Sequence, residues 1–181
     1  LFPVREIVSR EDRTMSTARF LLTAGASGSG KTLITCGILQ ALKNRGLQTA
    51  SFKCGPDYID PMFHTKVIGT KSRNLDTFFL PRRTEPDIYL KRNLEDCDIA
   101  VMEGVMGYYD GVGGTTTRAS AYDLAKVTQT PVVLIVNCKG MSVSILPFIQ
   151  GFVNFMPDSN IKGVLLNQNF FHAVSQSKRN D

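Results

Sequence analysis

The sequence predicts an α/β fold in which a mostly parallel sheet carries helices on both faces. Several segments are apolar throughout, such as "TPVVLIVNC" (130–138), which is typical of strands buried on both faces of a sheet. They alternate with segments of helical spacing, which is the order of strand–helix–strand units. Hydrophobic residues make up 43% of the 181 residues, so one domain can bury a core. In such a sheet, ligands bind at the carboxyl ends of the strands.

Five strands and four helices are expected along the chain. The first strand, 18–24, leads through a glycine-rich turn into a helix at 31–46, where apolar residues recur at helical spacing before Gly46. Segments 54–64 and 106–117 are rich in turn-forming proline or glycine and are expected to be loops. The other expected strands are 47–54, 97–105, 130–138 and 161–168, and the other expected helices are 86–95, 118–129 and 143–155.

Composition excludes several classes of protein. Residues 1–14 lack the apolar core of a signal peptide, so we expect a leader or irregular arm before one domain at 15–181. The net charge of +5 suits an anionic ligand, but the basic residues are scattered and mark no nucleic-acid site. No apolar run approaches a membrane span. The four cysteines form neither a metal template nor a glutaminase nucleophile motif, which suits a reducing cytoplasm.

The stretch "GASGSGKT" (25–32) lies between the first strand and the first helix. It fits the pattern G-x-x-x-x-G-K-[ST], in which backbone N–H groups cradle phosphates. Lys31 is expected to reach the β- and γ-phosphates, and the Thr32 hydroxyl to hold Mg²⁺. This context predicts a P-loop NTPase fold. The expected nucleotide-binding residues are Gly25, Ser27, Gly28, Ser29, Gly30, Lys31 and Thr32.

Two further features narrow the class of P-loop protein. A guanine pocket requires N-K-x-D after a later strand, and "VNCKG" (136–140) lacks the aspartate, so ATP is favoured. Switch ATPases of the partitioning type carry a second lysine just after the first glycine. Ala26 occupies that position, which counts against a switch that dimerises on ATP.

Two carboxylates, Asp57 and Asp60, lie between prolines in "FKCGPDYIDPMFH" (52–64). Prolines stiffen the segment, so the pair could hold Mg²⁺ or orient a nucleophile beside the phosphates, with solvated turn aspartates as the alternative. Lys53 precedes the pair and could stabilise phosphate charge, or could lie at a surface strand end. His64 alone would more often be structural.

Two later stretches also carry polar candidates. Glu103 lies at the end of an apolar strand in "VMEGVMGYYDG" (101–111), where it can complete a Mg²⁺ shell. In the following loop, Thr115 and Ser120 could donate to substrate carboxylates, with helix capping an equal alternative for Ser120. "SRNLDTFFL" (72–80) offers Arg73 as a carboxylate clamp, or else a capped helix entrance with its two phenylalanines in the core.

These stretches, in this order and spacing, resemble the cobyrinic acid a,c-diamide synthases. "TAGASGSGKT", "FKCGPDYIDPMFH", "SRNLDTFFL" and "VMEGVMGYYDG" carry the resemblance, and "PVVLIVNCKGM" and "IKGVLLNQ" continue it over about residues 18–168. More distantly, the layout is similar to dethiobiotin synthetase, which shares the P-loop and the strand-end "EG". The resemblance implies a dethiobiotin synthetase-like P-loop fold.

The resemblance also implies a reaction. Such enzymes use ATP and Mg²⁺ to phosphorylate the a- and c-carboxylates of cobyrinic acid in cobalamin biosynthesis, and ammonia then displaces the phosphate. The implied catalytic residues are Lys31, Asp57, Asp60 and Glu103, and the implied metal ligands are Thr32, Asp57 and Glu103. The implied substrate-facing residues are Lys53, Tyr58, His64, Arg73, Asn74, Asp76, Thr115 and Ser120.

In this family a C-terminal glutamine amidotransferase domain supplies the ammonia, and fold relatives are often homodimers. That domain is absent from the sequence, and the synthetase domain itself is expected to be incomplete at its C-terminal end. Three alternatives remain open at this point. The chain could be a sister amidase acting on hydrogenobyrinate or nickel-sirohydrochlorin, a P-loop ATPase regulated by a partner, or an inert fragment.

Overall fold

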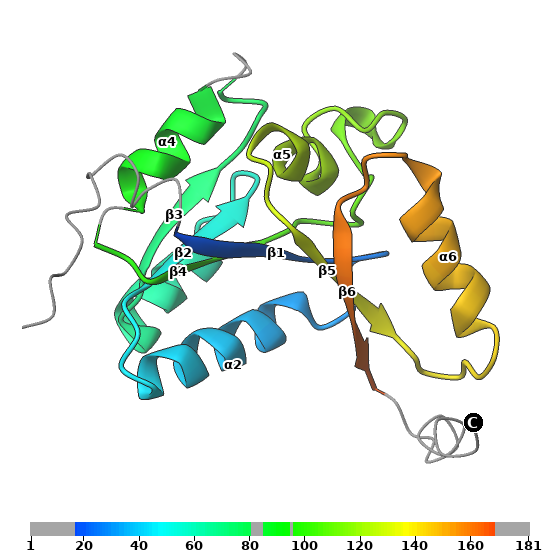
Figure 1. The fold of residues 1–181 in the computed structure, drawn as a ribbon, viewed down its shortest axis with the longest axis horizontal. Helices are drawn as coiled ribbons and strands as arrows, with labels where there is room; N and C mark the ends of the chain where they lie inside the picture. The colour runs from blue at the N-terminus through cyan, green and yellow to red at the C-terminus, as the bar shows by residue number, and fades with distance from the viewer. Residues whose placement is uncertain (1–16, 81–84, 95, 169–181) are drawn as a thin grey trace, which may run out of the picture.

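The computed structural model describes residues 17–80, 85–94 and 96–168. Its centre is a six-stranded sheet in the order β3-β2-β4-β1-β5-β6, and every neighbouring pair is parallel (Figure 1). The strands are β1 (Ala18–Ala24), β2 (Thr49–Cys54), β3 (Lys71–Leu75), β4 (Ile99–Glu103), β5 (Val132–Asn137) and β6 (Ile161–Asn167). The predicted parallel α/β architecture is confirmed. The expected arm at 1–14 lies outside the described residues.

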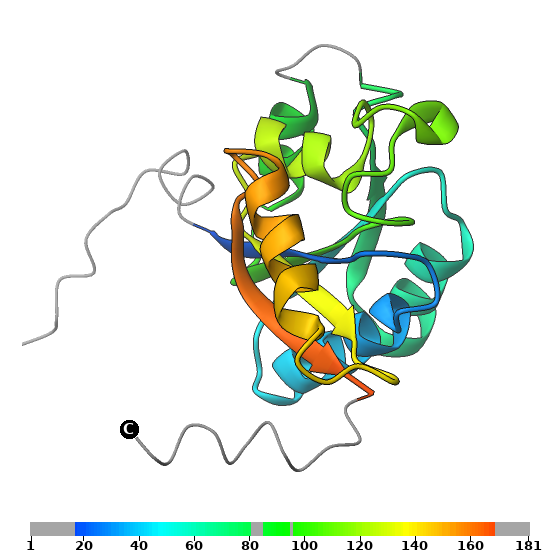
Figure 2. The same ribbon diagram turned by 90° about the vertical axis from the view of Figure 1, so that its right-hand side faces the viewer.

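Helices cover both faces of the sheet, as predicted (Figures 1 and 2). One face packs on α2 (Lys31–Asn44), and the other on α4 (Glu85–Asn93), α5 (Ala121–Val127) and α6 (Ile145–Phe155). Neighbouring residues on β1 show the alternation, since Leu21 packs with the α4 and α5 side and Leu22 with the α2 side. Both are buried, and this double burial explains why the strands are apolar throughout.

The structure differs from the sequence prediction in four places. β3 was not predicted, because this edge strand is polar and three of its five side chains are exposed. Segment 54–64, expected to be a loop, contains the short helix α3 (Ile59–Phe63), which the π-helix η1 (His64–Ile68) continues. Phe78 and Phe79 are 51% and 64% exposed, so the alternative that placed them in the core is wrong. A 3₁₀ turn, η2 (Val112–Gly114), interrupts the expected loop at 106–117.

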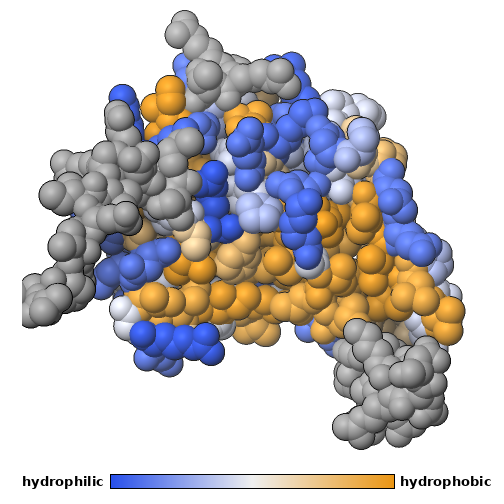
Figure 3. Space-filling model, in the orientation of Figure 1, coloured by the Kyte–Doolittle hydropathy of each residue, from blue (hydrophilic) through white to orange (hydrophobic). Residues whose placement is uncertain are grey.

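The far edge of the sheet is open and apolar. β6 pairs only with β5 among the described strands, and Val164 and Leu166 on it are 40% and 39% exposed. Figure 3 shows a broad apolar surface on this side of the molecule. Of the helices in the described part of the chain, none has the length and apolar character needed to cross a membrane.

Candidate functional site: a phosphate loop beside a buried polar cluster

The P-loop, residues 25–32, connects β1 to α2 at the carboxyl end of the sheet. Gly28 and Gly30 adopt φ values of 75° and 88°, which side chains rarely tolerate. α6 packs closely against the start of the loop. A Cβ added at Gly25 would lie only 2.7 Å from Phe148 Cζ of that helix. Ser29 Oγ donates to the Ala26 carbonyl at 2.9 Å, which closes the loop on itself. Ser27 and Gly28 are exposed at its tip.

Lys31 is buried and folds across the loop. Its Nζ donates to the Ala26 carbonyl at 3.1 Å and to the Met106 carbonyl at 2.7 Å. Burial lowers the pKa of Lys31, and the nearby charge of Lys53 lowers it further, while Glu103 and Asp110 compensate only in part. Two neutral carbonyls are weak partners for an ammonium ion, so an anionic phosphate at this place would be a better one.

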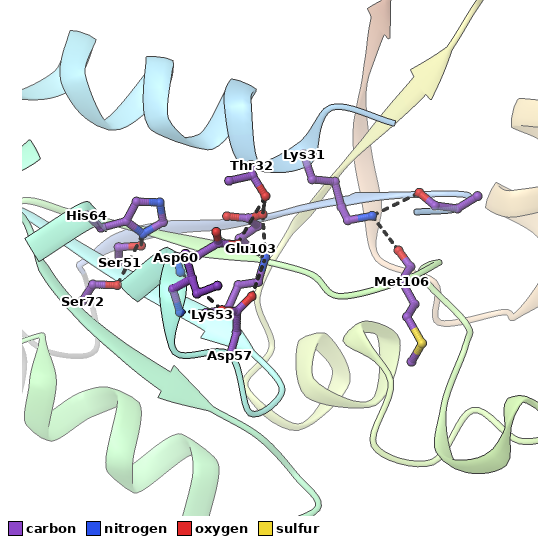
Figure 4. A network of polar contacts seen from close by, with 12 residues as sticks. Lys31, Thr32, Ser51, Lys53, Asp57, Asp60, His64, Ser72, Glu103 and Met106 are labelled. Carbon is purple, nitrogen blue, oxygen red and sulfur yellow. Dashed lines mark hydrogen bonds and ion pairs between the residues drawn. The ribbon is translucent and has the colours of Figure 1, made fainter. Parts of the chain in front are cut away.

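A polar cluster lies beside the P-loop and consists of Thr32, Lys53, Asp57, Asp60 and Glu103 (Figure 4). Lys53 and Glu103 at its centre are buried, Asp57 and Asp60 are partly exposed, and Thr32 is exposed. Sheet register creates its centre, because Lys53 on β2 is the register partner of Glu103 on β4. Lys53 Nζ lies 2.6 Å from Asp60 Oδ2, 2.7 Å from Glu103 Oε1 and 3.8 Å from Asp57 Oδ2. Thr32 Oγ1, at the start of α2, lies 2.7 Å from Glu103 Oε1 and 3.3 Å from Asp60 Oδ2.

The contact between Lys53 and Asp60 favours the ionised form of both groups. Burial acts to lower the pKa of Lys53, but Glu103 and Asp60 outweigh burial and raise it above its ordinary value. Burial acts to raise the pKa of Asp60, but the hydrogen bonds and charge of Lys53, with help from Thr32, bring it below its ordinary value. Lys53 is therefore an internal cation. Its side chain is only 5% exposed, so the alternative that placed it at a surface strand end is wrong.

The cluster has the chemistry of a Mg²⁺ site. Glu103 is fully buried, and its Oε2 has no hydrogen-bond partner among the described residues. A buried acceptor without a partner is stabilised when a cation or a hydrogen-bond donor binds it. No group of three His, Cys, Asp or Glu side chains in the described ranges forms a metal cage. Mg²⁺ typically uses one or two protein carboxylates and completes its shell with water and phosphate oxygens, and Asp60 and Glu103 supply two carboxylates beside the Thr32 hydroxyl.

The two aspartates of the acidic pair have different positions. Asp60 lies beside Thr32 and Glu103, whereas Asp57 was the aspartate expected there. Asp57 Oδ1 instead accepts from the backbone N–H groups of Ile59 and Asp60 at the start of α3, and its Oδ2 reaches Lys53 at 3.8 Å. The spacing of the motif predicted the pair, but only the α3 turn determines which member faces the P-loop.

Three of the substrate-facing candidates border one groove next to the cluster. Tyr58, Arg73 and Asn74, together with Asp57, line an open groove of about 370 Å³ between α3 and β3. Tyr58 is 81% exposed, and Arg73 and Asn74 are exposed edge-strand residues. Asp57 therefore belongs to both the groove and the cluster, so a molecule in the groove would lie beside the cluster. We call this feature the Tyr58 groove.

The remaining substrate-facing candidates lie elsewhere or serve the fold. The His64 ring is fully buried and its Nδ1 lies 3.0 Å from Ser51 Oγ, so it does not face the groove. Ser120 caps α5 by accepting from the Asp123 N–H at 3.2 Å. Helix capping was the alternative to a substrate contact for this residue. Asp76 Oδ1 accepts from the Phe78 N–H at 2.7 Å. Thr115 is exposed on the loop after β4.

Sequence reasoning missed two residues of the site. Asn167, the last residue of β6, donates from Nδ2 to the Ser29 carbonyl of the P-loop at 2.9 Å. The rule that singled out Glu103, a polar residue at the carboxyl end of a strand, would have found it. Met106, whose carbonyl accepts from Lys31, has a φ of 49°, and nothing in its residue type indicates this.

Comparison with known proteins shows the family to which the sequence belongs. The family described as "CobQ/CobB/MinD/ParA nucleotide binding domain" matches residues 20–170. The cobyrinate a,c-diamide synthase of Priestia megaterium is 42% identical over 154 residues, which are 85% of this chain and 33% of that protein. The hydrogenobyrinate a,c-diamide synthase of Streptomyces coelicolor is 40% identical over 161 residues, which are 89% of this chain and 33% of that protein.

A solved structure supports the fold alone. The BceF tyrosine kinase domain superposes with a TM-score of 0.54 at 11% identity, over 87% of this chain and 72% of that one. This chain spans about a third of the length of the curated relatives it matches. The family match extends from β1 through β6 and includes the P-loop and the polar cluster. The chain therefore belongs to the CobQ/CobB/MinD/ParA nucleotide-binding domain family.

Proposed function

We propose that this chain is the ATP-dependent synthetase part of a corrinoid a,c-diamide synthase, which activates a substrate carboxylate as an acyl phosphate. The observation that carries the proposal is the Tyr58 groove, which meets the polar cluster at Asp57 beside the P-loop. The names of relatives about 42% identical support the corrinoid substrate class. Relatives named for cobyrinate and for hydrogenobyrinate are similar to nearly the same degree, so the proposal covers both.

The proposed reaction has two displacements. A carboxylate oxygen of the corrinoid attacks the γ-phosphorus of ATP, and ADP leaves. Ammonia then attacks the acyl carbon, phosphate leaves with the former carboxylate oxygen, and loss of a proton gives the amide. Phosphorylation is needed because a carboxylate oxygen is a poor leaving group, so the protein mainly positions the reactants and neutralises charge.

Each residue has a proposed task in that scheme. Lys31 leaves the Ala26 and Met106 carbonyls to bind the β- and γ-phosphates. Thr32, Asp60 and Glu103 would hold Mg²⁺, which when bound neutralises phosphate charge. Arg73, with Asn74 beside it, lies at the groove and is placed to bind a carboxylate of the substrate.

Ammonia is proposed to come from a glutamine amidotransferase domain or subunit. A glutaminase of that class needs a cysteine nucleophile with a lowered pKa. Burial instead raises the pKa of all four cysteines, that of Cys54 to about 12. The thiols of this chain are therefore not activated for glutamine hydrolysis.

The test is ADP release from Mg-ATP and ammonium with and without cobyrinic acid. We expect release that depends on the corrinoid, is lost in Lys31→Ala and persists in Lys91→Ala, a matched lysine variant on the surface of α4 that removes a pair with Asp87. Turnover indifferent to the corrinoid would contradict the proposal and favour the partner-regulated ATPase. Nucleotide binding without corrinoid-dependent release would show that this chain alone does not form a complete active site.

A further inference from the structure

Lys53 occupies the centre of the proposed metal site. Its ammonium group contacts Asp60 Oδ2 at 2.6 Å and Glu103 Oε1 at 2.7 Å, the same two oxygens that approach the Thr32 hydroxyl (Figure 4). These oxygens are also those that would bind Mg²⁺ if Thr32 is a ligand. An ammonium ion and Mg²⁺ repel each other, so both cannot remain close to the same pair of oxygens without a further anion between them.

The cluster also carries more negative charge than Lys53 neutralises. Asp57, Asp60 and Glu103 face one ammonium ion, and Glu103 Oε2 is fully buried with no partner among the described residues. The other buried lysine beside the cluster, Lys31, directs its Nζ to two carbonyls. The cluster is therefore held together by Lys53 and still has a free acceptor for a second cation.

We propose that Lys53 is an internal counter-ion that takes the place of Mg²⁺ until the nucleotide arrives. In the nucleotide-free protein its Nζ holds Asp60 and Glu103 together and keeps free Mg²⁺ out. With the nucleotide bound, Thr32, Asp60 and Glu103 would hold Mg²⁺, and the Lys53 ammonium would turn to the phosphate oxygens. The inference rests on the proposed function, because it assumes that the cluster is the metal site.

This arrangement couples the binding of metal and nucleotide. Free Mg²⁺ must displace the Lys53 ammonium from Asp60 and Glu103, which leaves this buried cation with only the more distant Asp57, at 3.8 Å. That loss of close anionic partners is unfavourable. With a nucleotide present, the phosphates give Lys53 a new anionic partner, so each ligand favours the binding of the other. The rival explanation is a purely structural ion pair. It predicts that loss of Lys53 only destabilises the fold.

The test removes the ammonium ion and measures metal binding without nucleotide. We expect Lys53→Met to bind Mn²⁺, used as a paramagnetic substitute for Mg²⁺, at least about tenfold more tightly than the unaltered chain in titrations followed by electron paramagnetic resonance. Its thermal midpoint should fall in EDTA and recover in MgCl₂, whereas that of the unaltered chain should be the same in both. Lys31→Met is the matched control, because Lys31 contacts carbonyls and its loss should not tighten Mn²⁺ binding.

A Lys53→Met variant that loses stability and gains no Mn²⁺ affinity would overturn the inference. Should the variant not fold, the ¹⁵N resonance of the Lys53 side chain in the unaltered protein decides: it should move with Mg-ADP and stay in place with Mg²⁺ alone. Movement with neither, although Mg-ADP binds, would overturn the inference. Nucleotide binding that is indifferent to Mg²⁺ in the unaltered protein would instead contradict the proposed metal site.

Discussion

Two buried lysines lie in the site with opposite electrostatic surroundings. Lys31 contacts carbonyls, and burial lowers its pKa. Lys53 contacts carboxylates, which raise its pKa despite burial. The charge of Lys53 is thus already paired within the protein, whereas Glu103 and Asp110 only partly offset the burial of Lys31, whose charge a bound anion would stabilise further. We therefore expect Lys31 to respond most directly to a bound phosphate and Lys53 to a bound metal.

The buried ring of His64 gives a prediction for the pH dependence of stability. Burial lowers its pKa, while Glu103 and Asp60 act in the opposite direction and do not prevent the shift. Below the ordinary value of 6.5, the unfolded chain takes up a proton that the folded protein resists, so the free energy of unfolding falls as pH decreases. Urea denaturation between about pH 7.5 and about pH 5.5 should show a smaller decrease in His64→Gln than in the unaltered protein. Equal decreases would contradict the assignment.

Gly107 shows how closely the loop after β4 approaches the P-loop. A Cβ there would lie 2.7 Å from the Gly25 carbonyl oxygen, which belongs to the backbone and cannot simply turn away. We expect Gly107→Ala to lower the free energy of unfolding by roughly 1–3 kcal/mol and to weaken nucleotide binding.

The matched control for Gly107 is Gly37 in the middle of α2. A Cβ at Gly37 would meet nothing within 4 Å. Gly37→Ala should therefore raise the free energy of unfolding by about 0.5–1 kcal/mol, because alanine favours the helix. Denaturant titration of both variants checks the pair, and a stable Gly107→Ala protein would show that the two loops can move apart.

At the scale of elements, the start of α5 and the loop before it carry two substrate-facing candidates, Ser120 and Thr115, with different surroundings. Ser120 accepts from the Asp123 N–H as the N-cap of this helix, whereas Thr115 on the preceding loop is exposed. Ser120→Ala should lower the free energy of unfolding by about 1 kcal/mol, as loss of an N-cap does. Thr115→Ala should leave stability within about 0.5 kcal/mol of the unaltered protein.

Urea denaturation and corrinoid titrations of these two variants distinguish the roles. If Ser120→Ala keeps its stability but weakens corrinoid binding, Ser120 acts on the substrate and the capping assignment is insufficient.

The elements also show what could be read from the sequence. Apolar segments predicted five strands, because strands buried on both faces need side chains of one kind. β3 escaped prediction because it is a polar edge strand, and α3 because its prolines resemble those of a turn. The P-loop and Glu103 were identified from a motif and from a strand-end position. The contact of Lys53 with Glu103 depends on β2 lying next to β4, and strand order is not encoded in local periodicity.

At the scale of the whole molecule, strand order concentrates the site at one end of the sheet. β1 leads into the P-loop. On one side of it, β2 carries Lys53 as its last residue but one, and β4 ends in Glu103. On the other side, β6 ends in Asn167, whose side chain contacts the P-loop. The Tyr58 groove lies between α3 and β3, on the side of the polar cluster away from the P-loop. Phosphate, metal and carboxylate sites are thus expected in one row along the strand ends.

The measurement that tests this account most directly is trapping of the acyl phosphate with hydroxylamine. The chain would be incubated with Mg-ATP, cobyrinic acid and hydroxylamine in the absence of ammonia, and the corrinoid examined by mass spectrometry. The account predicts a corrinoid hydroxamate formed together with ADP, and neither product in Lys31→Ala. Release of ADP that depends on the corrinoid but yields no hydroxamate would contradict carboxylate activation as the function of this site.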